Sequence, residues 1–227
     1  MIHDIAGTVR AVRRRRRGPR AFTLLETMMA LVIIGVGILA YVDAQTSFIK
    51  TNGWSSQAGT AMLLANEIRE MTRRLPRHDP VTGLFVDGSS GSPVLVGWGR
   101  EAGEATAADI DDIDDLDGIQ FGNGGTLPGP IDAYGNVVPE VDINGLVETN
   151  SGVPVPLEGW SQRVIVEKVD PYNYSTVRAA GYSQAATSSL PAIPVNGFPL
   201  RVTVVVEYQS VNDASPQEIA RVTWVRP

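Results

Sequence analysis

The feature that most constrains the fold is an apolar run that begins at Phe22 and continues to Val42. It contains no charged side chain from Ala30 onward, and its only carboxylate is that of Glu26. At about 1.5 Å per residue, a helix of this length spans about 30 Å, which is the thickness of the hydrocarbon core of a bilayer. The run therefore predicts a membrane-spanning helix over residues 22–42.

Charge is distributed unevenly on the two sides of this run. Residues 1–21, MIHDIAGTVRAVRRRRRGPRA, carry seven arginines and one aspartate, a formal charge of +6, whereas residues 22–227 carry −12. Because positively charged flanks stay in the cytoplasm, we expect the N-terminus there and the chain after Val42 on the outside of the inner membrane. The acidic body argues against direct binding to nucleic acid.

The composition provides few of the residues from which active sites are usually built. No cysteine is present, and His3 and His78 are the only histidines. Disulfides, thiolate metal sites and thiol chemistry are therefore excluded, and Ser-His catalysis or a histidine-based zinc site has almost no residues to use. We expect no enzymatic activity and no catalytic residue.

A helical pattern continues beyond the apolar run and predicts one helix over residues 22–75. Pro76 cannot continue this helix and disfavours helical geometry at the residue before it. Glycines weaken the helix, and the sequence Thr51-Asn52-Gly53 is the expected site of a local break. Apolar residues in the second half recur at three- and four-residue spacing, which predicts an amphipathic segment: Ala58, Ala61, Met62, Ala65, Ile68, Met71 and Leu75.

The remainder of the chain separates into a loop-rich region and a sheet. Residues 76–160 are rich in Gly, Pro, Asp and Ser, which predicts loops with short strands. Residues 161–227 contain three β-branched, roughly alternating segments at 162–169, 200–208 and 219–225. We therefore expect an α+β fold, in which the long N-terminal helix packs on a small C-terminal antiparallel β-sheet.

Residues 18–26, GPRAFTLLE, together with the apolar run, resemble the prepilin-type signal of type IV pilins and type II secretion pseudopilins. That signal has a basic leader, a small residue before the cleavage point, Phe as the first mature residue and Glu as the fifth. The matching residues here are Ala21, Phe22 and Glu26. The family nearly always has Gly at the position of Ala21, so we expect cleavage to occur more slowly.

The resemblance implies a non-enzymatic minor pilin or pseudopilin. Prepilin peptidase would remove residues 1–21, Phe22 would be N-methylated, and the helix would contact an inner-membrane assembly platform and other pilin subunits. The protein would then leave the inner membrane for a periplasmic or extracellular filament, either a type IV pilus or a secretion pseudopilus.

A special role for Glu26 also follows from physical chemistry. A carboxylate inside a membrane helix costs about 2.5–3.5 kcal/mol on insertion scales, so it needs a partner. Cleavage before Phe22 creates a positive α-amine one helical turn away, and pairing of Glu26 with the amine of a neighbouring subunit would set axial register. Alternatively, Glu26 reaches the lipid headgroups at the membrane surface.

Two other readings of the N-terminus stay open. The first is a secreted β-domain whose conventional signal peptide is cleaved after Ala44. The second is a permanently anchored single-span protein, which shares the topology and lacks the cut. Glu26 and the helical pattern beyond Ala44 argue against the first.

An acidic run, DIDDIDDLDG at residues 109–118, offers oxygen ligands suited to calcium. Its spacing does not match an EF-hand loop, and no other cofactor is expected. The alternative is a solvated acidic turn with Ile110, Ile113 and Leu116 facing inward. The candidate calcium ligands are Asp109, Asp111, Asp112, Asp114, Asp115 and Asp117.

Overall fold

The computed structural model describes residues 23–89 and 91–227. The leader and both residues of the predicted cleavage point, Ala21 and Phe22, lie outside the described residues. The chain divides into two units, Met1–Asn52 and Gly53–Pro227, and helix α1 contributes to both.

Helix α1 extends from Leu24 to Arg74 without interruption, which confirms the predicted long helix. It ends two residues before Pro76, as expected from the restrictions that proline imposes. The predicted break at residues 51–53 is wrong, because these residues are helical. One glycine costs about 1 kcal/mol, and helix propagation from the long segments on both sides offsets that cost.

The first unit is the part of α1 that could cross a membrane. Helix α1 is the one helix of the described residues that is long and apolar enough to do so. Its large apolar side chains from Leu24 to Leu39 are 57–81 % exposed. Exposure of so large an apolar surface to water is unfavourable, whereas lipid or another apolar helix would cover it.

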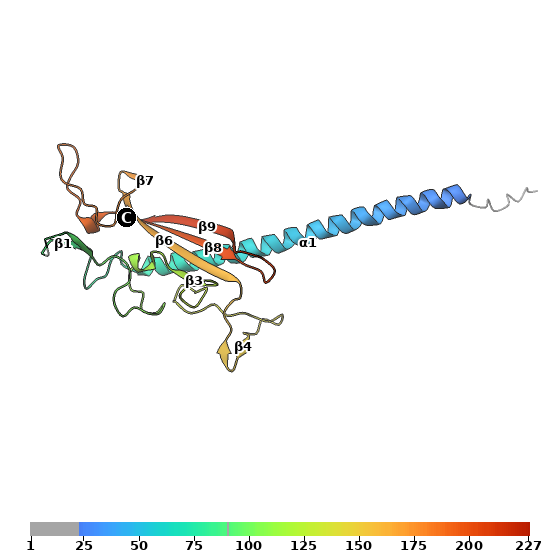
Figure 1. Ribbon diagram of the computed structural model, residues 1–227, viewed down its shortest axis with the longest axis horizontal. Coiled ribbons are helices and arrows are strands. Elements are labelled where there is room, and N and C mark those ends of the chain that lie inside the picture. The colour runs from blue at the N-terminus through green and yellow to red at the C-terminus, as the bar shows by residue number, and fades with distance from the viewer. Residues whose placement is uncertain (1–22, 90) are drawn as a thin grey trace, which may run out of the picture. The chain divides into compact units, whose positions relative to one another are not determined.

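The second unit is built on an antiparallel sheet with the strand order β3-β6-β8-β9, in which β7 also pairs with β6 (Figure 1). The strands are β3 (Gln120–Gly122), β6 (Trp160–Asp170), β7 (Asn173–Val177), β8 (Leu200–Tyr208) and β9 (Gln217–Arg226). The three predicted strands are confirmed as β6, β8 and β9, whereas β3 and β7 were not predicted.

Short elements occupy the connections. Two small antiparallel pairs are β1 (Phe85–Asp87) with β2 (Val94–Val96) and β4 (Thr149–Asn150) with β5 (Val153–Pro154). Single-turn 3₁₀ helices form at η1 (Asp114–Leu116) and η2 (Val195–Gly197). The long helix α1 and the antiparallel sheets together confirm the predicted α+β class.

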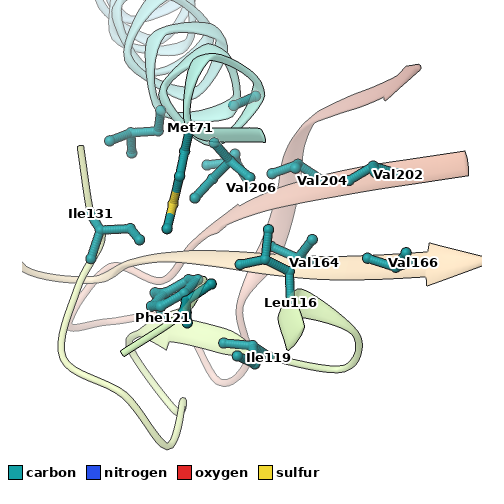
Figure 2. Close-up of a cluster of buried hydrophobic side chains, with 14 of the residues drawn as sticks. Met71, Leu116, Ile119, Phe121, Ile131, Val164, Val166, Val202, Val204 and Val206 are labelled. Atoms are coloured by element: carbon teal, nitrogen blue, oxygen red, sulfur yellow. The ribbon is translucent and has the colours of Figure 1, made fainter. Parts of the chain in front are cut away.

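One face of the sheet packs against the second half of α1. Alternate residues of β6 and β8 meet across the pairing, for example Val164 opposite Val204 and Val166 opposite Val202. Figure 2 shows Met71 pointing from α1 toward Phe121 of β3 in this cluster. The fully or nearly fully buried helix residues are Ala61, Leu64, Ala65, Ile68, Met71 and Thr72.

This stripe differs from the predicted one at Met62, Leu64 and Thr72. Met62 was expected to face the core and is 47 % exposed, whereas Leu64 and Thr72 were not expected there and are 2 % and 0 % exposed. Successive residues of an α-helix are separated by about 100°. Leu64 therefore lies on the face of Ala61 and Ile68, while Met62 is turned toward solvent.

Gln162 on β6 is a fully buried polar residue that joins three parts of the second unit. Its side-chain oxygen accepts a hydrogen bond from the Ile131 amide at 2.7 Å. Its side-chain nitrogen donates to the carbonyls of Leu64 on α1 at 2.8 Å and of Ile131 at 3.0 Å. The amide group thereby links the helix, the sheet and the loop that contains Ile131.

Replacement of Gln162 by Leu is expected to lower the free energy of unfolding by about 2–3 kcal/mol, because it leaves the buried Ile131 amide without an acceptor. Urea unfolding of the full chain in mild detergent, followed by tryptophan fluorescence, measures this change. The same substitution at the exposed Gln217 on β9 is the control, with an expected change within about 0.5 kcal/mol. Equal stability of both variants would contradict the linking role.

Candidate functional sites at the helix start and in the acidic loop

The start of α1 is stabilised by reciprocal hydrogen bonds between Thr23 and Glu26. The Glu26 carboxylate accepts from the Thr23 amide at 3.0 Å and from its hydroxyl at 3.2 Å. The Glu26 amide in turn donates to the Thr23 hydroxyl oxygen at 3.3 Å. This arrangement is a capping box, which satisfies amides at a helix N-terminus that have no partner within the helix.

The capping box gives Glu26 a role within its own chain, in addition to the predicted pairing with a neighbour. Its side chain is exposed, so its second oxygen can still meet a partner. A negative charge in the first turn also interacts favourably with the helix dipole. This cap was not predicted, although the Thr-x-x-Glu spacing by itself indicates it.

Three of the six predicted calcium ligands form hydrogen bonds with residues outside the acidic run. Asp109 accepts from the amide and the hydroxyl of Thr106, each at 2.8 Å. Asp117 accepts from the Val166 amide of β6 at 3.0 Å. One carboxylate oxygen of Asp114 lies 3.1 Å from His78 Nδ1 and the other accepts from the Gly99 amide at 3.3 Å. These three side chains tie the acidic loop to its neighbours.

The other three predicted ligands lie together. Asp111, Asp112 and Asp115 each present an oxygen within 4.8 Å of the others, and so do Glu101, Glu104 and Asp115. Asp115 therefore belongs to both groups. The two glutamates were not predicted as ligands, because they lie outside the DIDDIDDLDG run, in a loop that folds back onto it.

The alternative prediction, a solvated acidic turn, is correct for the inward-facing apolar residues and wrong for three aspartates, which are buried. Ile110, Ile113 and Leu116 are buried, as that alternative expected. Asp112, Asp114 and Asp115, however, are at most 1 % exposed. Apolar residues at three-residue spacing draw the intervening chain into the core, and the aspartates between them are buried with it.

Burial changes the ionisation of these carboxyls. Burial, followed by the neighbouring Asp114, raises the pKa of Asp112 to about 8. Burial and the charge of Asp112 raise the pKa of Asp115 to about 7. The pKa of Glu101 is raised to about 7 by burial and by the charges of Asp115 and Glu104. Each of these carboxyls therefore keeps its proton to a higher pH than usual, unless a cation stabilises the ionised form.

Two basic residues lie near the loop. The buried imidazole of His78 faces Asp114, and burial lowers its pKa to about 4, so the neutral ring donates from Nδ1. Lys168 on β6 is 1 % exposed and donates to the backbone carbonyls of Ala180 and Val195. Burial lowers the pKa of Lys168 to about 8, although the charge of Asp114 acts in the opposite direction. No role for this lysine was predicted from the sequence.

Residues 16–42 match the family model of the prokaryotic N-terminal methylation motif. No curated protein and no solved structure matches the chain. The matched segment includes the basic residues before Ala21, the residues of the capping box and the apolar run of α1. It supports a prepilin-processed, pilin-like subunit that is anchored in a membrane before assembly, and it implies prepilin peptidase and other pilin subunits as partners. The chain therefore carries the prepilin-type signal of type IV pilins and pseudopilins.

Proposed function

We propose that the protein is a minor pilin or pseudopilin without enzymatic activity, cleaved between Ala21 and Phe22 and N-methylated on Phe22. Before assembly it is stored in the inner membrane with its N-terminus in the cytoplasm and residues 53–227 on the other side. An assembly platform then extracts it into a type IV pilus or a secretion pseudopilus, where its apolar helix exchanges lipid for the helices of other subunits.

The observation that carries this proposal is the methylation motif at residues 16–42, which coincides with an exposed apolar helix. The orientation is supported by the seven arginines before the apolar run, since basic flanks stay in the cytoplasm. Exposed apolar side chains from Leu24 to Leu39 provide the surface that other helices would cover.

The direct test is the intact mass and N-terminal sequence of the protein from membranes of cells with and without prepilin peptidase. We expect a mature chain that begins at methylated Phe22, and accumulation of the uncut chain when the peptidase is deleted. Replacement of Ala21 by Gly, which restores the usual family residue, is expected to speed the cut. The ratio of cut to uncut chain over time measures that rate.

Replacement of Ala44 by Leu is the matched control, because it blocks the alternative signal-peptidase site and leaves the prepilin site intact. This variant should be processed like the unaltered chain. A mature chain that begins at Gln45 would instead identify a secreted domain, and an uncut chain in normal cells would identify a permanent anchor. Either result would overturn the filament proposal.

A further inference from the structure

The acidic loop and the segment before it form a carboxylate site of a kind that the methylation motif does not explain. Glu101 and Glu104 lie in the loop that follows β2, and Asp115 lies in η1. The Gly99 amide donates to Asp114, which holds the first loop against η1. The Glu101 amide donates to the Glu104 carboxylate at 2.8 Å, which orients Glu104 beside it.

Several oxygens in this site are enclosed and have no hydrogen-bond donor among the residues that the structure describes. They are Oδ1 of Asp115, whose residue is 1 % exposed, and both carboxylate oxygens of Glu101. The other oxygen of Asp115 accepts from the amides of Asp111 and Asp112, which holds the carboxylate in a fixed orientation. Buried polar atoms usually have a partner, so these oxygens require a partner that the described part of the chain does not supply.

No basic side chain of the described residues neutralises this site. Glu101, Glu104, Asp111, Asp112 and Asp115 take part in none of the ion pairs within residues 23–89 and 91–227. Arg100 donates to the backbone carbonyl of Glu104 and not to a carboxylate. Lys168 donates to backbone carbonyls, and the neutral imidazole of His78 faces Asp114. Carboxylates that face one another without a basic partner are the arrangement that a bound cation stabilises.

We propose that Glu101, Glu104 and Asp115 bind a single calcium ion, beside the second carboxylate group that Asp111 and Asp112 form with Asp115. Their oxygens lie within 4.8 Å of one another, and two oxygens on opposite sides of a calcium ion are separated by about that distance. The ligands are all oxygens, which favours a hard cation over zinc. Magnesium demands near-ideal octahedral geometry and retains water, so it fits three convergent carboxylates less well.

This site differs from the one predicted from the sequence. Two of its three ligands come from residues 101–104, and Asp109, Asp114 and Asp117 are engaged elsewhere. Because Glu101 and Glu104 precede η1 and Asp115 lies within it, bound calcium would clamp the loop after β2 onto the acidic loop. Calcium would therefore stabilise the second unit.

The test uses the full chain in mild detergent, stripped with a chelator and titrated with calcium by calorimetry. We expect binding of one calcium ion and a rise in the unfolding temperature of about 5 °C at saturation. Magnesium at the same concentration should produce a smaller rise. The absence of both binding heat and thermal shift at millimolar calcium would overturn the proposal.

The diagnostic variants are Glu101→Gln and Glu104→Gln, each expected to weaken calcium binding at least about tenfold. Both remove a negative charge from a site of like charges, so they should fold without calcium at least as stably as the unaltered chain. The matched control is Asp109→Asn, which removes a carboxylate of the acidic run that belongs to neither group and should change the affinity less than about twofold. Equal affinity of Glu101→Gln and the unaltered chain, or equal losses in all three variants, would exclude this ligand set.

Discussion

A chain in which Glu26 is replaced by Gln is expected to be cut and to insert into the membrane like the unaltered protein, but to be lost from filaments. Removal of one partner of a buried ion pair costs about 3–5 kcal/mol. If Glu26 pairs with the Phe22 amine of a neighbouring subunit, incorporation should therefore fall more than about a hundredfold. The ratio of filament-bound to membrane-bound subunit measures this loss.

This substitution separates the two roles of Glu26. A glutamine at the same position can still accept a hydrogen bond from the Thr23 amide, so the capping box is retained while the charge is removed. Thr23→Ala has the opposite effect, because it removes the cap of α1 and keeps the carboxylate. Loss of such a cap costs about 1 kcal/mol, so Thr23→Ala should reduce incorporation only a few-fold.

Glu70→Gln is the control for removal of a charge from α1. Glu70 is exposed in the second half of the helix and pairs only with Arg73 within the described residues. We expect normal assembly of this variant, because exposed ion pairs contribute little. Normal assembly of Glu26→Gln together with failure of Thr23→Ala would contradict intersubunit pairing and assign the function of Glu26 to capping.

The fold could largely be predicted from the sequence because its main elements have strong local signals. The apolar run and Pro76 define α1, and alternating β-branched residues define β6, β8 and β9. Strand β3 could not be predicted, since Gln120–Gly122 has no alternation of its own and becomes a strand only by pairing with β6. Tertiary contacts, which no local window contains, decide such short strands.

The same dependence on tertiary contacts explains which parts of the candidate sites could be predicted from the sequence. The signal around Ala21, Phe22 and Glu26 is contiguous, so the sequence displays it completely. The carboxylate group at Asp115 depends on a loop that brings Glu101 and Glu104 beside η1, and spacing along the chain does not encode that contact. Composition indicated an acidic region, but burial and hydrogen bonding determine which carboxylates remain available to a cation.

Replacement of Lys168 by Met is expected to lower the free energy of unfolding by about 2–4 kcal/mol. The Lys168 ammonium donates to the carbonyls of Ala180 and Val195, and no backbone amide of the described residues donates to either carbonyl. Methionine fills a similar volume and leaves both acceptors unpaired, so the loop between β7 and β8 loses its attachment to β6. Urea unfolding of the full chain in detergent measures the loss.

The pH dependence identifies the Lys168 side chain as the cause. Burial lowers the pKa of Lys168 to about 8 in the folded chain, whereas an unfolded lysine titrates near about 10.4. The unfolded state therefore binds more protons between these values, and this lysine makes stability increase as the pH rises from about 8 to about 10.4. Lys168→Met should lack that contribution, so its stability deficit should widen over the same range.

The chain provides a matched control, because Lys50 is its only other lysine and is exposed on α1. Lys50→Met makes the same chemical change without removing a buried donor, and we expect a change in stability within about 0.5 kcal/mol. It should also leave the pH dependence between about 8 and 10.4 unaltered. Equal stability of Lys168→Met and the unaltered chain would mean that the cost of burying the ammonium cancels its hydrogen bonds, so that Lys168 does not stabilise the loop.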